Sequence, residues 1–258
     1  MTGAAPARAV VRAAIVPLLA EPRASSPQVS QRLAGHALEV LAGDGPWSLV
    51  RGADGYEGWV HEGYIARPAA MGARQSGTSR RVSLGCVTRI PGGGRRALPL
   101  GAYLSPGEAP ESGRLVEEPR LPFEFPNTAD AVARSAAEFF EGTSYQWGGI
   151  TPWGADCSGF VQSLFALHGT ALPRDASQQA RAGAAADRAL ADLRAGELAF
   201  FSDRDDGAIT HVGLGLGGAR MAHVAIGRGG FAVERLDAGR DPYLEALRGR
   251  FRFARKIF

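Results

Sequence analysis

Three residues that lie far apart in the sequence could together carry out nucleophilic catalysis: Cys157, His211 and His223. Cys157 falls in the first turn of a predicted helix with Ala155 or Asp156 as its cap. The unpaired amides and the positive end of the helix dipole at that position favour a thiolate over a thiol. A thiolate attacks a carbonyl carbon, and a neighbouring base completes the arrangement. We expect His211 to take or share the Cys157 proton, and His223 to hold the His211 imidazole in the needed tautomer.

Each of these residues also has a structural interpretation. Free cysteine is often buried as a small apolar side chain, and a histidine on a strand can be a satisfied core residue. A Cys/His/His metal site is a further alternative, although the three residues lack the spacing of a local binding motif and no fourth ligand is evident. We expect neither a metal nor another cofactor. The other histidines are predicted to be surface or structural residues: His36, His61 and His168.

The elements that must position this set lie in residues 127–258, where helices precede strands. A first helix is predicted from a cap at Asn127 or Thr128 to Gly142, and a second from Cys157 to Gly169. A short third helix and then four strands follow, at residues 175–183, 197–202, 211–217, 221–227 and 231–236. This order indicates an α+β domain in which the strands of the two histidines pack under the cysteine helix.

Two β-rich zones precede this domain. In residues 8–68 short apolar runs alternate with glycine turns, which is the pattern of a small β-barrel. This zone resembles a bacterial SH3-like domain, because three of its habitual segments match in order at 33–41, 47–50 and 54–60. Residues 80–120 are predicted to form a second, degenerate barrel of the same kind. The proline-rich stretch after it, "VEEPRLPFEFP", is expected to be an extended connector.

The composition limits the classes of partner. The formal net charge is +3 and the basic residues are scattered, so we expect no nucleic-acid or membrane partner. Two cysteines do not make a disulfide framework, and Cys86 is assigned to packing. The apolar run at 13–20 is short for a signal-peptide core and far too short for a membrane span. These features favour a cytoplasmic protein.

Six ordered segments identify a family resemblance over residues 127–258. They are "Y-x-W-G-G" at 145–149, "D-C-S-G-F-V" at 156–161, "L-P-R-D" at 172–175, "G-E-L-A-F-F" at 196–201, "H-V-G" at 211–213 and "H-V" at 223–224. The set resembles the NlpC-type cysteine peptidases, papain-like enzymes that cut peptidoglycan stem peptides. The resemblance implies that Cys157 is the nucleophile, His211 the base and His223 the orienting residue.

The resemblance also implies roles for residues around the cysteine. Tyr145 would donate its hydroxyl to the oxyanion, with a core aromatic as the alternative. Trp147 would form a wall of the pocket. Asp156 would pair with the free α-ammonium of the substrate, and it could at the same time be the helix N-cap. Ser158 and Arg174 would line the peptide site, although Arg174 could equally be a stabilising surface charge.

The barrel zone of such enzymes supplies groups that read the free amine of the substrate. The candidates in this chain are Tyr56, Glu57 and Tyr64. The chain departs from the family pattern at Pro27 and Gln28, where an acidic residue is common, and at Ala176, where a serine is common. The departures leave the way in which the amine is recognised open.

Together with the SH3-like zones, the resemblance implies that the whole chain is a γ-D-glutamyl-L-diamino-acid endopeptidase. Its substrates would be murein tri- and tetrapeptides with a free N-terminal L-Ala, released during wall turnover. Two alternatives remain: an exported peptidoglycan hydrolase with wall-binding SH3-like domains, and a non-catalytic wall-binding protein. Neither the diamino acid nor the oligomeric state follows from the sequence.

Overall fold

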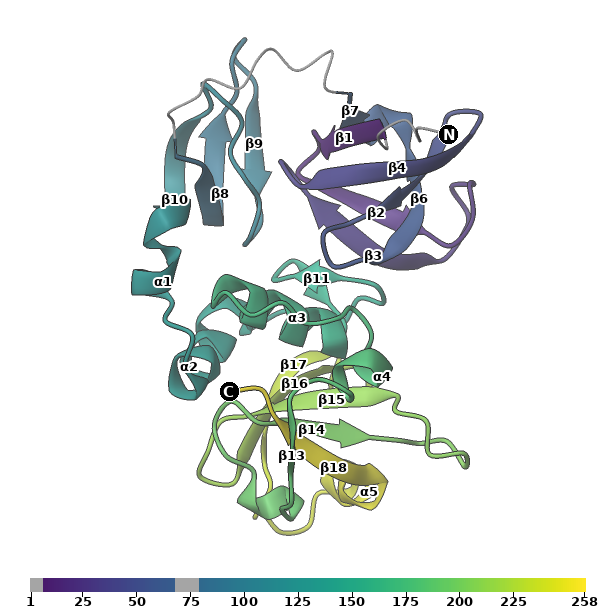
Figure 1. The fold of residues 1–258 in the computed structure, drawn as a ribbon. Helices are drawn as coiled ribbons and strands as arrows, with labels where there is room; N and C mark the ends of the chain where they lie inside the picture. The colour runs from purple at the N-terminus through teal and green to yellow at the C-terminus, as the bar shows by residue number, and fades with distance from the viewer. Residues whose placement is uncertain (1–6, 68–78) are drawn as a thin grey trace. The chain divides into compact units, whose positions relative to one another are not determined.

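The computed structural model describes residues 7–67 and 79–258, which form two compact units, Met1–Arg120 and Leu121–Phe258 (Figure 1). Within these residues, no helix combines the length and the apolar character needed to cross a bilayer. The predicted barrel over 8–68 ends at a residue that lies outside the described ones.

The first unit opens with a seven-stranded antiparallel sheet in the order β3-β2-β6-β5-β4-β1-β7. Its strands are β1 (Ala7–Val11), β2 (Ile15–Leu19), β3 (Gln28–Leu33), β4 (Ala37–Asp44), β5 (Trp47–Arg51), β6 (Glu57–His61) and β7 (Ile65–Ala66), with a 3₁₀ turn η1 at Glu62–Tyr64. Alternate residues point inward, as Val50 and Val60 do, and are fully buried. They pack with apolar residues of four other strands to form one core, which includes Val16, Leu38 and Ile65.

The described residues of the second β-rich zone form a three-stranded antiparallel sheet in the order β10-β8-β9. The strands are β8 (Arg81–Arg89), β9 (Arg95–Leu98) and β10 (Ala109–Glu117). Cys86 pairs with Leu98 across the sheet and is 5% exposed, so it packs as a small apolar side chain. A buried carboxylate, that of Glu108, accepts hydrogen bonds from Arg96 at 2.6 Å and from the Ser105 amide at 2.8 Å.

The stretch predicted to be an extended connector is helical in part, so that prediction is wrong. A 3₁₀ turn η3 covers Glu118–Arg120, and a short helix α1 covers Leu121–Glu124. Pro119 and Pro122 each occupy the second residue of their element. An amide in the first turn has no intrahelical partner, so proline costs little there.

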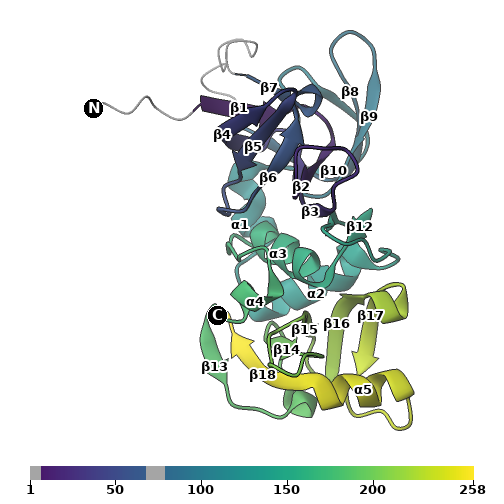
Figure 2. The ribbon, with the colours of Figure 1, turned by 90° about the vertical axis from the view of Figure 1, so that its right-hand side faces the viewer.

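The second unit contains the predicted helices, α2 (Ala129–Phe140), α3 (Cys157–Leu167) and α4 (Ala176–Gln179). Its antiparallel sheet has the order β13-β18-β14-β15-β16-β17. The predicted strands are confirmed as β14 (Leu198–Phe201), β15 (His211–Gly215), β16 (Arg220–Ala225) and β17 (Gly230–Arg235). The remaining elements are β11 (Ile150–Thr151), β12 (Gly154–Ala155), β13 (Ala184–Ala186), η4 (Leu190–Asp192), η5 (Ile226–Arg228), α5 (Pro242–Arg250) and β18 (Phe251–Lys256). Helices α2 and α3 cover one face of the sheet and α5 lies on the other (Figures 1 and 2).

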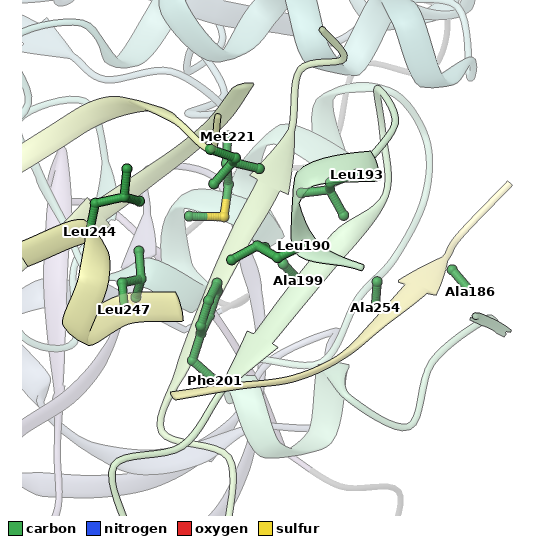
Figure 3. Close-up of a cluster of buried hydrophobic side chains, with 10 residues drawn as sticks. Ala186, Leu190, Leu193, Ala199, Phe201, Met221, Leu244, Leu247 and Ala254 are labelled. Atoms are coloured by element: carbon green, nitrogen blue, oxygen red, sulfur yellow. The ribbon is translucent and has the colours of Figure 1, made fainter. Parts of the chain in front are cut away.

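Helix α5 and strand β18 were not predicted from the sequence. Leu244 and Leu247 of α5 pack against Phe201 and Met221 in the buried cluster on their face of the sheet (Figure 3). The helix begins at Pro242 after the N-cap Asp241, whose carboxylate accepts from the amides of Tyr243 and Leu244. This Asp-Pro pair is a helix start signal in the sequence.

Candidate active site

The start of helix α3 places Cys157 as the first helical residue. Asp156 is the N-cap, and its Oδ1 accepts from the Gly159 amide at 2.8 Å. Gly159 must be glycine, because a Cβ there would lie 2.0 Å from the carbonyl oxygen of Gly149. The "D-C-S-G" and "W-G-G" segments are therefore two sides of one close backbone contact, which fixes the loop before the helix against its first turn.

Asp156 also forms a buried ion pair with Arg174. Arg174 Nη1 lies 3.0 Å from Oδ1, and Nη2 lies 2.6 Å from Oδ2. The Gly148 amide donates to the same carboxylate at 2.9 Å, and the Ser158 hydroxyl at 3.2 Å. The N-cap interpretation of Asp156 is confirmed, and the surface interpretation of Arg174 is wrong because that side chain is 2% exposed. The contact of Asp156 with a substrate ammonium stays a prediction.

The thiol of Cys157 is protonated in the substrate-free site. Burial raises its pKa to about 12, and the charge of Asp156 acts in the same direction. Backbone hydrogen bonds from Val212 and Ser158 lower the pKa, but they offset only part of the burial. The prediction that the helix position favours a thiolate is therefore wrong for the substrate-free site. The bond from Val212 also places the sulfur against β15, at the residue that follows His211.

His211 begins β15 and reaches a second histidine on the neighbouring strand. Its Nε2 lies 2.9 Å from Nδ1 of His223, which is fully buried in β16. Nε2 of His223 in turn lies 3.2 Å from Oε1 of Glu234 on β17. Three adjacent strands therefore contribute one residue each to a single hydrogen-bonded chain.

The protonation of the two histidines follows from the charge of Glu234. Burial acts to raise the pKa of Glu234, but hydrogen bonds from His223 and Arg228 outweigh it and lower the pKa to about 2. An ionised carboxylate can only accept, so Nε2 of His223 carries the proton of that bond. In an uncharged His223, Nδ1 is then an acceptor for the Nε2 proton of His211. The remaining lone pair of His211 is on Nδ1, so this nitrogen can act as a base and accept a proton.

His211 is uncharged at neutral pH. Burial lowers its pKa to about 3, and repulsion between two protonated rings, its own and that of His223, would act in the same direction. Asp203 raises this pKa and Arg250 lowers it, both by smaller amounts. At rest the Cys157 thiol and the His211 imidazole are therefore both neutral, and the thiol proton must move when the sulfur attacks.

Tyr145 lies close enough to Cys157 for the charge of an ionised sulfur to act on its hydroxyl. Burial raises the pKa of Tyr145 to about 12, and the charges of Cys157 and Asp156 contribute. The hydroxyl therefore keeps its proton at neutral pH and can donate to a developing oxyanion. Its main chain is held by a hydrogen bond from its amide to the Gly229 carbonyl at 3.0 Å and by a bridge to Ala155.

The other sequence candidates divide between the two units. Ser158 is buried and accepts from Arg174 Nη1 at 2.9 Å, whereas Trp147 is 67% exposed. Tyr56, Glu57 and Tyr64 belong to the first unit, where Glu57 pairs with Arg51 at 2.7 Å. Their roles toward a substrate stay predictions. His168 is structural as predicted, since it ends α3 and its ring contacts the Pro126 carbonyl and the Ser135 hydroxyl.

Sequence reasoning missed Glu234, Arg228 and Asp241. Arg228 donates to Glu234 through Nε at 2.7 Å and Nη2 at 2.9 Å, and it pairs with Asp241 as well. Nothing in the local sequence marks Glu234, because a charged residue in a strand is usually on the solvent face. Across residues 7–67 and 79–258, no cluster of histidine, cysteine or acidic side chains is arranged to hold a metal ion.

Comparisons with known proteins agree with this geometry. Residues 142–242 match the NlpC/P60 family, and residues 16–66 match the bacterial SH3 domain. A γ-D-glutamyl-L-lysine dipeptidyl-peptidase of Bacillus subtilis is 32% identical over 216 residues, which is 74% of this chain and 70% of that protein. A bifunctional muramidase/DL-endopeptidase of the same organism is 46% identical over 94 residues, 36% of this chain and 28% of that protein.

The fold is also found in a solved structure. The crystal structure of an NlpC/P60 family protein from Bacillus cereus superimposes with a TM-score of 0.79 at 20% identity, over 97% of this chain and 99% of the other. With the cysteine at the start of α3 and the two histidines on adjacent strands, the chain belongs to the NlpC/P60 family of cysteine peptidases and carries a bacterial SH3 domain ahead of its catalytic unit.

Proposed function

We propose that this protein hydrolyses the γ-D-glutamyl–L-diamino-acid bond of murein stem peptides that carry a free N-terminal L-Ala. The observation that carries the proposal is the His211–His223 hydrogen bond of 2.9 Å, together with a cysteine at the start of α3 whose sulfur is hydrogen-bonded by Val212, the neighbour of His211. The name of the Bacillus subtilis relative supports the choice of bond, because that protein is a γ-D-glutamyl-L-lysine dipeptidyl-peptidase.

The first half of the proposed reaction forms an acyl-enzyme. The thiol proton of Cys157 passes to Nδ1 of His211 as the sulfur attacks the γ-carbonyl carbon of D-Glu. The carbonyl oxygen becomes an oxyanion, toward which Tyr145 donates its hydroxyl. The C–N bond then breaks, and the imidazolium of His211 returns the proton to the departing amine of the diamino acid.

The second half restores the free enzyme. A water molecule gives a proton to His211 and attacks the thioester carbon. The C–S bond breaks, the sulfur takes the proton from His211, and L-Ala-D-Glu leaves with a new γ-carboxylate. The atoms balance: the departing amine keeps the proton of the thiol, water supplies the proton that returns to the sulfur, the proton of the new γ-carboxylic acid goes to solvent, and no oxidation state changes.

The buried pair of Asp156 and Arg174 has a proposed part in recognition. It fixes the Ser158 hydroxyl, which accepts from Arg174 and lies next to the sulfur in the chain. We propose that Ser158 and Trp147 line the path of the peptide. The assignment of Tyr56, Glu57 and Tyr64 to the free amine stays a prediction, as does a cytoplasmic location.

The test is mass spectrometry after incubation with L-Ala-γ-D-Glu-L-Lys and with its meso-diaminopimelate counterpart, each beside an N-acetylated copy. The proposal expects L-Ala-D-Glu and the free diamino acid from one or both free peptides and neither product from the acetylated ones. Equal cleavage of the free and the acetylated peptides would refute recognition of the free amine. If no peptide is cut, the proposed reaction fails.

A second experiment, with purified sacculi as the substrate, separates the exported alternative. Peptides in intact sacculi have their N-termini blocked by the glycan, so an enzyme that requires a free amine leaves sacculi undigested. Release of fragments from purified sacculi would favour the wall hydrolase with a wall-binding SH3-like domain instead.

A further inference from the structure

The hydrogen-bonded chain of the active site continues beyond the two histidines into the protein. Glu234 is 5% exposed, and its Oε1 lies 3.2 Å from Nε2 of a fully buried His223. Arg228 contacts both oxygens of this carboxylate. A carboxylate so far inside is costly unless it is paired, and here its partners are the orienting histidine and one arginine.

We propose that Glu234, held by Arg228, is a positioning residue that fixes the proton of His223 on Nε2 and so leaves Nδ1 of His211 free to accept the proton of Cys157. The proposal rests on the proposed function for its effect on turnover. Its prediction about where the protons lie does not depend on any substrate.

With both imidazoles uncharged, the donors and acceptors allow one arrangement. If His223 carried its proton on Nδ1 instead, its Nε2 lone pair would face the carboxylate of Glu234, and two acceptors would meet at 3.2 Å. Nδ1–H would then face Nε2 of His211, so His211 would have to carry its own proton on Nδ1. In that state the side of the imidazole that must take the thiol proton is already occupied.

Arg228 keeps the carboxylate in place from the outer side. It donates to Oε1 and Oε2 in a fork, its guanidinium lies 4.2 Å from the centre of the Tyr243 ring, and it also pairs with Asp241. Asp241 is the N-cap of α5, so the hydrogen-bonded series from His211 to Glu234 is connected through Arg228 to the start of that helix. Tyr243 contacts the His223 ring as well, with 6.1 Å between the ring centres. Residues at the start of α5 thus pack around the Glu234 end of this hydrogen-bonded series.

The charge of Glu234 has a second consequence for the reaction. The resting thiol and imidazole are neutral, and His211 becomes positive only as the sulfur attacks. A fixed negative charge two hydrogen bonds away stabilises that imidazolium more than it stabilises the resting pair. The other charged groups that act on His211 are Asp203, which favours the imidazolium, and Arg250, which disfavours it.

The substitution that tests the proposal is Glu234→Gln. The amide NH₂ of glutamine must face either Arg228 Nη2 or the position shared by Arg228 Nε and His223 Nε2, and both are donors. We expect kcat for the γ-D-glutamyl tripeptide to fall roughly tenfold to a hundredfold, as is typical when a group that orients a reacting residue is lost, with KM changed less than about twofold. Arg235→Gln is the matched control, because it removes an exposed ion pair with Asp237 from the next position of β17.

The direct readout is ¹⁵N NMR of the histidine side chains. In the unaltered protein at neutral pH, we expect both His211 and His223 to be protonated on Nε2 and unprotonated on Nδ1. In Glu234→Gln we expect a measurable population of His223 protonated on Nδ1, and in Arg235→Gln none. A merely structural role for Glu234 would lower the melting temperature without moving this proton.

Two results would overturn the proposal. One is a His223 of the unaltered protein that carries its proton on Nδ1, and the other is wild-type kcat in a folded Glu234→Gln variant. Failure of the proposed function looks different, because the unaltered protein would then leave the peptide uncut while the NMR spectra still report the positions of the protons.

Discussion

Nε2 of His211 lies 2.9 Å from Nδ1 of His223, across the neighbouring strands β15 and β16. Because His223 also donates to Glu234, this bond runs in one direction, from His211 to His223. The direction matters more than the contact itself. It leaves the other nitrogen of His211 as the base of the active site, next to the segment that contacts the Cys157 sulfur.

Replacing His223 tests whether its acceptor atom is what catalysis requires. His223→Leu removes the acceptor, so we expect kcat to fall roughly 10³-fold or more, by analogy with loss of the orienting residue in serine proteases. His223→Gln keeps a carbonyl oxygen that can accept from His211, and its kcat should be clearly higher than that of the leucine variant. Steady-state kinetics would check this, with thermal melts to show that both variants are folded. Equal activities in the two variants would contradict the orienting role.

The protonation state of Cys157 can be followed by its alkylation. With a pKa of about 12, raised first of all by burial, the thiolate fraction grows about tenfold per pH unit throughout the neutral and alkaline range. We expect the rate of carbamidomethylation by iodoacetamide to keep rising beyond pH 9, where an ordinary thiol levels off. Intact-protein mass spectrometry of a Cys86→Ala variant measures the reaction of this sulfur alone. A rate that is already constant near pH 7 would indicate a thiolate–imidazolium pair at rest.

The hydroxyl of Tyr145 is expected to act on the transition state. Since burial raises the pKa of Tyr145 to about 12, the group remains a donor across the working pH range. Tyr145→Phe should lower kcat roughly 10²-fold, as does loss of one oxyanion donor in other enzymes, with little change in KM. A variant with wild-type kcat would leave Tyr145 with only the packing role of an aromatic ring.

The ion pair of Asp156 and Arg174 is expected to be a main support of the catalytic unit. Arg174→Met leaves a carboxylate that is 8% exposed without its charged partner, which costs roughly 3–5 kcal/mol in the free energy of unfolding. Urea unfolding monitored on the catalytic unit would measure this loss. Arg204→Gln, which removes an exposed pair with Asp206, should leave the transition where it is. Equal transitions in the two variants would refute the structural role of the buried pair.

Much of the site could be predicted because its signals are local. The glycines and aspartate around Cys157 encode a tight loop and a helix cap, and the helix that follows has a clear apolar stripe. His211 and His223 stand in short apolar runs bounded by glycine. Each of these features is readable within ten residues, and the structure places all three side chains in the catalytic unit as expected.

The rest of the site depends on contacts that the local pattern conceals. In β17 the apolar Val233 is 43% exposed whereas the charged Glu234 is buried, which is the reverse of ordinary alternation. The reversal is stable because His223 and Arg228, from two other elements, pair with the carboxylate. Helix α5 escaped prediction for a related reason, since its apolar residues are interrupted by Arg248 and Arg250. The sequence predicts a thiolate at Cys157, but burial raises the pKa of this thiol more than the hydrogen bonds to the sulfur lower it.

The most direct test of the account is turnover of the γ-D-glutamyl tripeptide by a Cys157→Ala variant beside a Cys86→Ala variant. Both substitutions remove a buried cysteine, but Cys157 accepts a hydrogen bond from Val212, the neighbour of His211 in β15, whereas Cys86 lies in β8 of the first unit. We predict that Cys157→Ala loses at least roughly 10³-fold in kcat while Cys86→Ala keeps the activity of the unaltered protein. Hydrolysis by a folded Cys157→Ala variant at the unaltered rate would contradict it.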